Sequence, residues 1–187
     1  MNWQSTGLVT RLTDTLTSLA TERGFLDGEL IKVDDLEQCW QRSAPQYLAD
    51  AVPEVAHYPT VAVAWAAFFG LGAAKLWDSM WDYVKDKEDL YVFIRDVRGF
   101  DAMDDYVIEG LLMLRPSNPT RAEQLTSLLQ EAAETAITLI RKEQLAPQSP
   151  EAYYAFAKTC EVMYRLGVAI QMRAMGYKYH RMEVGLN

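Results

Sequence analysis

The run from Thr60 to Lys87 constrains the fold more than any other part of this sequence. Its apolar residues recur at spacings of three and four, which is the pattern of one face of an α-helix. The residues on this face are Val61, Trp65, Phe68, Phe69, Gly72, Leu76, Met80 and Tyr83. The first half of the run is apolar on every side, so other helices must surround it. The pattern predicts a central helix from about Pro59 to about Lys87, with Val61, Trp65, Phe68, Leu76 and Met80 buried.

A second face of the same helix changes from small residues to large ones. Its members are, in order, Ala62, Ala66, Gly70 and Ala73, followed by Trp77 and Trp81. A glycine in a helix interior costs about 0.5–1 kcal/mol relative to alanine, so Gly70 and Gly72 indicate a close neighbouring backbone. The neighbour must stand further off at the two tryptophans, which predicts a wedge lined by indole rings with Asp78 and Asp82 at its edge. Ordinary core packing of the tryptophans is the alternative interpretation.

The same run is too short to favour a membrane-spanning helix. Its uncharged part, Thr60 to Ala74, has 15 residues, whereas a span needs about 20. Lys75, Asp78 and Asp82 then end the apolar stretch. We therefore expect a buried helix and no contact with a membrane.

Helix start and stop signals divide the rest of the chain into further helices. The predicted helices run from Ser5 or Thr6 to Gly24, from Asp34 onward with Glu37 completing a capping box, over Gln46–Val52, over 101–114, from Pro119 to about Lys142, and from Pro150 to Gly176. Residues 90–97 form an apolar stretch that ends before Gly99. Residues 25–33 are predicted as a loop and 177–187 as a loosely packed tail. The prediction is an all-α, single-domain bundle spanning 1–187, with five to seven helices around the central one and three of them long.

Composition narrows the classes of function. The net charge of −8 argues against a nucleic-acid surface, which needs clustered Lys and Arg. Cys39 and Cys160 fall among apolar helix positions and are predicted to be free thiols. No basic segment followed by an apolar one opens the chain, and no disulfide framework is present, so we expect a cytoplasmic protein.

Catalytic and metal-binding motifs are scarce. The sequence has no G-x-S-x-G, P-loop, G-x-G-x-x-G, C-x-x-C or H-E-x-x-H motif, and only two histidines, His57 and His180. A di-metal bundle needs two Glu-x-x-His pairs. The chain has one such pair, Glu54-x-x-His57, and one reversed pair, His180-x-x-Glu183, neither of them on a predicted long helix. We expect both histidines in partly exposed loops and no bound cofactor.

The acidic residues give the main enzymatic alternative. Carboxylates on facing helices can hold Mg²⁺, which then binds phosphate. The set that would do so is Asp78, Asp82, Asp101 and Asp105, with Asp104 beside them. This alternative is a magnesium-dependent all-α phosphohydrolase. The competing interpretation is that acids in the first turn of a helix complement its dipole, which accounts for the 101–105 group without a ligand.

The favoured prediction is a non-enzymatic binding or self-associating protein. Its candidate ligand site is the wedge of Trp77, Asp78, Trp81 and Asp82, whose carboxylates and rings favour a cationic or polyhydroxylated ligand over an anionic one. Some helices carry more aromatic residues than a single core-facing stripe requires. We take this excess to predict a two-fold homodimer. These residues are Tyr91, Phe93, Tyr153, Tyr154, Tyr177 and Tyr179.

Overall fold

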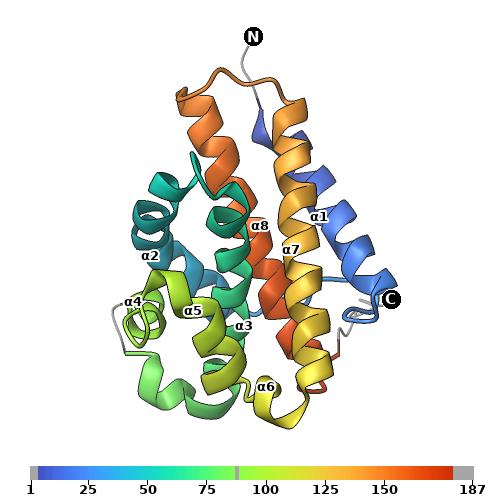
Figure 1. Ribbon diagram of the computed structural model, residues 1–187, viewed down its shortest axis with the longest axis vertical. Helices are drawn as coiled ribbons and strands as arrows, with labels where there is room; N and C mark the ends of the chain where they lie inside the picture. The colour runs from blue at the N-terminus through green and yellow to red at the C-terminus, as the bar shows by residue number, and fades with distance from the viewer. Residues whose placement is uncertain (1–3, 87–88, 179–187) are drawn as a thin grey trace, which may run out of the picture.

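The protein is an all-α bundle, as the sequence predicts. The computed structural model describes residues 4–86 and 89–178, in which no strand occurs. The elements are α1 (Ser5–Glu22), α2 (Asp34–Ala51), the 3-10 turn η1 (Val52–Glu54), α3 (Pro59–Val84), α4 (Leu90–Arg95), η2 (Phe100–Ala102), α5 (Met103–Asp105), the π-helix η3 (Tyr106–Leu111), α6 (Leu114–Ser117), α7 (Pro119–Lys142) and α8 (Pro150–Ala174). Helices α3 and α8 lie between α1 and α7 on one side and α2, α4 and α5 on the other (Figure 1).

Helices α3 and α8 run in parallel and form the most extensive helix pair among the described residues. The direction follows from two contacts: the Cys160 thiol lies 3.8 Å from the Ala62 carbonyl oxygen, and Gly167 packs against Ala67 further along both helices. A Cβ added at Gly167 would lie 2.0 Å from the Ala67 oxygen, and one added at Gly70 would lie 2.2 Å from the Tyr164 oxygen. The two backbones therefore touch at a pair of glycines, one from each helix, which explains why Gly70 stands inside an apolar helix.

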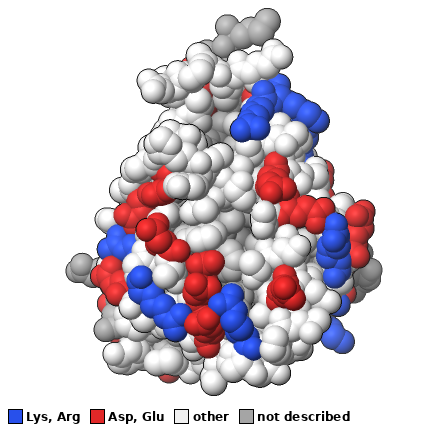
Figure 2. Space-filling model, in the orientation of Figure 1, with Lys and Arg blue, Asp and Glu red and all other residues white. Residues whose placement is uncertain are grey.

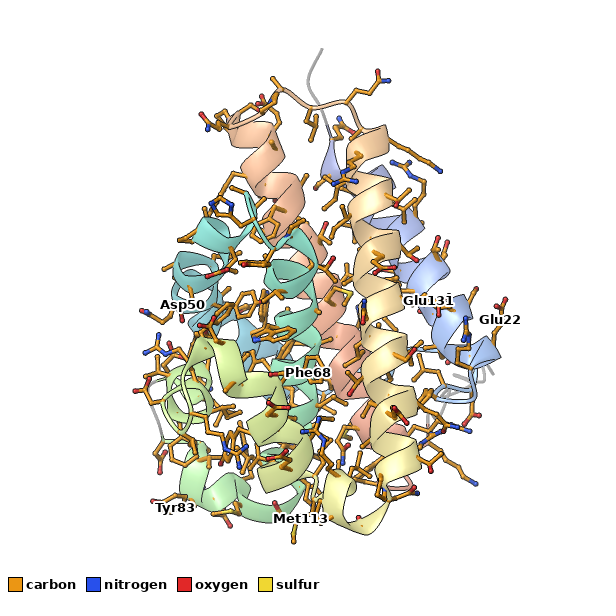
Figure 3. All side chains as sticks on the ribbon, in the orientation of Figure 1. Glu22, Asp50, Phe68, Tyr83, Met113 and Glu131 are labelled. Atoms are coloured by element: carbon orange, nitrogen blue, oxygen red, sulfur yellow. The ribbon has the colours of Figure 1, made fainter. Side chains whose placement is uncertain are left out.

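The central helix is confirmed, but three of the five residues that were predicted to be buried are not fully buried. Phe68 and Leu76 are buried, and Phe68 lies at the middle of the bundle (Figure 3), whereas Val61 and Trp65 are only partly buried. Met80 was predicted to be buried but is 45% exposed. Its backbone (φ −144°, ψ 25°) is not helical, so α3 is kinked there and the apolar stripe no longer faces the core. Tyr83, beyond the kink, is 59% exposed and lies with Met113 at the lower end of the bundle (Figure 3).

Helix α2 differs from the prediction in its interior and at its N-terminus. It runs without interruption through Pro45, so the predicted restart at Gln46 does not occur. Its N-cap is Val33, which offers no side-chain acceptor, and Glu37 does not close a capping box. Glu37 instead accepts three hydrogen bonds from the guanidinium of Arg165 on α8, at 2.8–3.1 Å. Because Arg165 is charged and forms several hydrogen bonds at once, it outcompetes the local backbone N–H groups.

The predicted helix at 101–114 is broken into short pieces. A 3-10 turn, one turn of α-helix and a π-helix follow one another from Phe100 to Leu111, and Met113 takes a left-handed conformation with φ 53°. Met103 and Val107 remain buried as predicted. The side chains of Val107, Leu111 and Ile94 approach within 3.1–3.3 Å of the place where a Cβ of Gly72 would stand. Gly72 thus makes room for side chains, and Gly70 for a backbone.

The starts of α7 and α8 follow the predicted signals, whereas α1 begins after Gln4 without a side-chain cap, so the cap predicted at Ser5 or Thr6 does not form. Asn118 caps α7 by accepting from the Arg121 N–H at 3.1 Å, and Ser149 caps α8 by accepting from the Ala152 N–H at 3.1 Å. Cys39 and Cys160 are buried free thiols, and burial raises the pKa of both. Among the described residues one helix, Pro59–Val84, is long and apolar enough to span a membrane; 72% of its most apolar window is buried inside the bundle, as expected of a core helix.

Candidate functional site

The end of α8 turns back onto the end of α3. Gly176 has φ +92°, a left-handed conformation that glycine adopts without steric cost, and the Tyr177 N–H donates to the Met172 carbonyl at 3.1 Å. This turn places the Tyr177 ring edge-on against Trp77, with centroids 5.6 Å apart. The Tyr177 hydroxyl donates to Asp78 Oδ1 at 2.7 Å, and this hydrogen bond raises the pKa of the phenol. The first residue of the predicted tail is therefore part of the bundle, whereas residues 179–187 lie outside the described residues.

The space that the sequence predicts as a wedge beside Trp77 is occupied. The indole N–H of Trp77 donates to Asp35 Oδ2 at 3.0 Å, from the first turn of α2. The ring of Tyr177 packs against the same indole, which remains partly exposed. Asp35 and Tyr177 were not among the predicted site residues, because no local pattern links them to α3.

The other half of the predicted site lies beyond the kink at Met80. Trp81 is partly buried, and Asp82 is exposed and pairs with Lys85 at 3.1 Å. The structure thus brings Trp77 and Asp78 together with Tyr177, and leaves Trp81 and Asp82 on a separate turn of the chain.

A cleft of about 340 Å³ adjoins this aromatic corner. It is lined by Leu26, Asp27, Glu29, Ile31, Arg173, Tyr177 and Lys178, which come from the loop between α1 and α2 and from the end of α8. Tyr177 is shared: it forms part of the cleft wall and also covers Trp77. None of the four predicted residues lines the cleft, but Trp77 and Asp78 hold the tyrosine that does.

Two of the four charged side chains of the cleft form an ion pair with each other. Arg173 donates from Nε to Asp27 Oδ2 at 2.9 Å and from Nη1 to the Gly24 carbonyl at 2.6 Å. Glu29 and Lys178 form no ion pair within 4.0 Å, with each other or with any other described residue. The cleft therefore offers one carboxylate and one ammonium group that form no ion pair within residues 4–86 and 89–178.

Comparison with protein-family models, with curated proteins and with solved structures finds no match. The roles of the residues therefore rest on their geometry alone.

The acids of the magnesium alternative are not gathered at one place. Asp105 pairs with Arg115 at 2.9 Å, and Asp101 is exposed. Desolvation raises the pKa of Asp104, which opposes its ionisation. In the part of the chain that the structure describes, no three His, Cys, Asp or Glu side chains form a group that could hold a metal ion. Of the Glu-x-x-His pairs, His57 is exposed, and His180 and Glu183 lie outside the described residues.

The aromatic residues predicted for self-association fall into two groups. Tyr91 is fully buried and donates to Asp50 Oδ2 at 2.5 Å, so it belongs to the core, and Phe93 is partly buried. Tyr153 and Tyr154 are about half exposed at the start of α8. Since α3 and α8 are parallel, Tyr58 and the neighbouring η1 lie at the same end. Figure 2 shows few charged side chains over this upper left part of the molecule.

Proposed function

We propose that the protein binds a small organic molecule in the cleft between the α1–α2 loop and the end of α8. The observation that carries this proposal is the cleft itself, whose volume of about 340 Å³ falls within the range of about 300–1,000 Å³ usual for ligand sites. Leu26, Ile31 and Tyr177 supply apolar surface, and four charged side chains surround it. In small-molecule sites, polar groups beside an apolar wall fix the orientation of the ligand.

The position of the cleft provides a built-in reporter. Trp77 contacts Tyr177, so a ligand that touches the tyrosine changes the surroundings of the indole. Binding is expected to shift Trp emission in the wild type and not in Trp77→Phe. It also raises the melting temperature, because a ligand at 100 times its Kd adds about 2.7 kcal/mol to the free energy of unfolding.

The test is a thermal-shift and fluorescence screen with amino acids, amines, polyols, inorganic phosphate and Mg²⁺. Ile31→Trp fills the cleft and should abolish the response, whereas Val97→Trp, on an exposed residue that does not line the cleft, should leave it unchanged. A response only to Mg²⁺ together with phosphate would instead favour the enzymatic alternative. Equal responses in the two tryptophan variants would place the site elsewhere and overturn the proposal.

A second candidate function is self-association through the upper end of the bundle. Five large apolar residues there are 40–62% exposed: Val52, Val55, Tyr58, Tyr153 and Tyr154. Two copies of a chain with net charge −8 repel each other least where acidic groups are few. Light scattering on the wild type should give the mass of a dimer at micromolar concentration. Tyr58→Ser with Tyr153→Ser should give a monomer, and Tyr83→Ser at the opposite end should not.

A further inference from the structure

The cleft carries equal numbers of acidic and basic side chains. Asp27 and Glu29 supply two carboxylates, and Arg173 and Lys178 supply two cations. Two opposite pairs cancel, so the lining as a whole attracts neither a simple cation nor a simple anion over a long distance. The preference for a cation that the sequence suggests through Asp78 and Asp82 does not take these basic groups into account.

Two of the four charges pair with each other, and the other two have no ion-pair partner among the described residues. The guanidinium of Arg173 is held by Asp27 and by the Gly24 carbonyl, which fixes the loop against the end of α8. Glu29 comes from that loop, and Lys178 follows Tyr177 on the opposite wall. Because these two groups line one cleft and lie more than 4.0 Å apart, both can be engaged only by a molecule that has a charge of each sign.

The fold holds the chain next to both residues. Gly28, which has φ +92°, donates its N–H to Thr21 Oγ1 at 3.0 Å and so holds the loop next to Glu29. The backbone before Lys178 is held by the hydrogen bond from Tyr177 to Asp78. Leu26 and Ile31 lie on the same lining and offer apolar surface to the rest of a ligand.

We infer that the ligand is a small zwitterion with an apolar side chain, as in a free α-amino acid. This inference rests on the proposed function, because it names the chemical class that the same cleft recognises. Glu29 binds the ammonium group, Lys178 binds the carboxylate, and Leu26, Ile31 and the Tyr177 ring contact the side chain. An ammonium group near the ring face gains a further attraction from the aromatic quadrupole.

The test compares three matched sets of compounds by calorimetry. The first set is leucine, methionine and phenylalanine; the second is the amine that each leaves after loss of its carboxylate; the third is the acid that each leaves after loss of its ammonium group. Since an exposed charge pair changes affinity only modestly, each missing charge should weaken binding by about three- to fivefold. Glu29→Gln should weaken the binding of the amino acids and amines but not that of the acids. Lys178→Met should weaken the binding of the amino acids and acids but not that of the amines.

Two variants at the far end of the bundle serve as controls. Glu151→Gln and Lys142→Met make the same chemical changes on exposed residues of α8 and α7 and should leave every affinity unchanged. If amines or acids bind as tightly as the amino acids, or if Glu29→Gln and Lys178→Met bind the amino acids like the wild type, the zwitterion is wrong while the cleft remains a binding site. If the amino acids do not bind and polyols do, the zwitterion is again wrong and the cleft again remains a binding site. If nothing in either screen binds, the proposed function falls as well.

Discussion

The close crossing of α3 and α8 at Gly70 and Gly167 leads to a sharp prediction about stability. In Gly167→Ala the new Cβ would lie 2.0 Å from the Ala67 oxygen and 2.8 Å from its carbonyl carbon. Real Cβ atoms essentially never come closer than 3.0 Å to such a neighbour, so α3 and α8 must separate locally by about 1 Å. A gap of that size forfeits a quarter to a half of each dispersion contact along the pair.

The expected magnitude follows from two opposing effects. Overpacking a close-packed core typically costs about 1–3 kcal/mol, and the upper part of the range applies because the obstacle is backbone, which cannot rotate away. Alanine recovers about 1 kcal/mol in helix propensity. We expect a net loss of about 2 kcal/mol, which corresponds to a fall of about 4–8 °C in melting temperature for a chain of this size.

Two glycines of the same chain provide the controls. A Cβ at Gly72 would meet side-chain methyl groups at 3.1–3.3 Å, and one at Gly7 would meet only the end of the Arg11 side chain at 3.3 Å. Gly72→Ala should therefore lose less than Gly167→Ala, and Gly7→Ala should be neutral or stabilising. Thermal unfolding monitored by circular dichroism measures all three. A Gly167→Ala protein as stable as Gly7→Ala would refute the close crossing of α3 and α8.

Three further predictions concern stability. Phe68→Ala should lower the free energy of unfolding by about 3–5 kcal/mol, because the ring is 2% exposed. Pro45→Ala should raise it by about 1 kcal/mol or more, as measured by urea unfolding, since alanine restores a backbone hydrogen bond inside α2. Asp104→Asn should raise the melting temperature at pH 7: desolvation raises the folded-state pKa of Asp104, so its ionisation destabilises the fold above that pKa, and the gain should vanish below the unfolded value of about 3.9.

The parts of the fold that depend on local sequence were predicted well. The starts of α7 and α8 follow from a capping residue before a proline, and Asn118 and Ser149 do make the expected hydrogen bonds. The central helix follows from a periodic apolar stripe. The close backbone that Gly70 predicts is that of α8. Each of these predictions uses a signal from residues within a few positions of one another, although the partner of Gly70 lies far away in the sequence.

The errors arise where a distant residue decides the outcome. Glu37 pairs with Arg165, which is 128 positions away, and does not cap its own helix. The stripe at Met80 fails because of a kink in the backbone, which side-chain periodicity does not report. The cleft was missed for the same reason: it joins residues 26–31 to residues 173–178. Its one local signal is Gly176 after a long helix, which marks a reversal of the chain without saying what the reversed chain contacts.

The parallel arrangement of α3 and α8 links the core to the proposed site. Because both helices end at the same end of the bundle, the turn at Gly176 brings Tyr177 onto Trp77 and Asp78. The depth at which Tyr177 meets α3 depends on how closely the helices cross at Gly70 and Gly167. A separation of about 1 Å at the crossing is passed along two rigid helices, since packed interiors transmit displacement. Gly167→Ala should therefore weaken the hydrogen bond between Tyr177 and Asp78 and loosen the cleft wall, so that its Trp77 emission shifts toward that of a Tyr177→Ala protein, whereas Gly7→Ala should leave the emission unchanged.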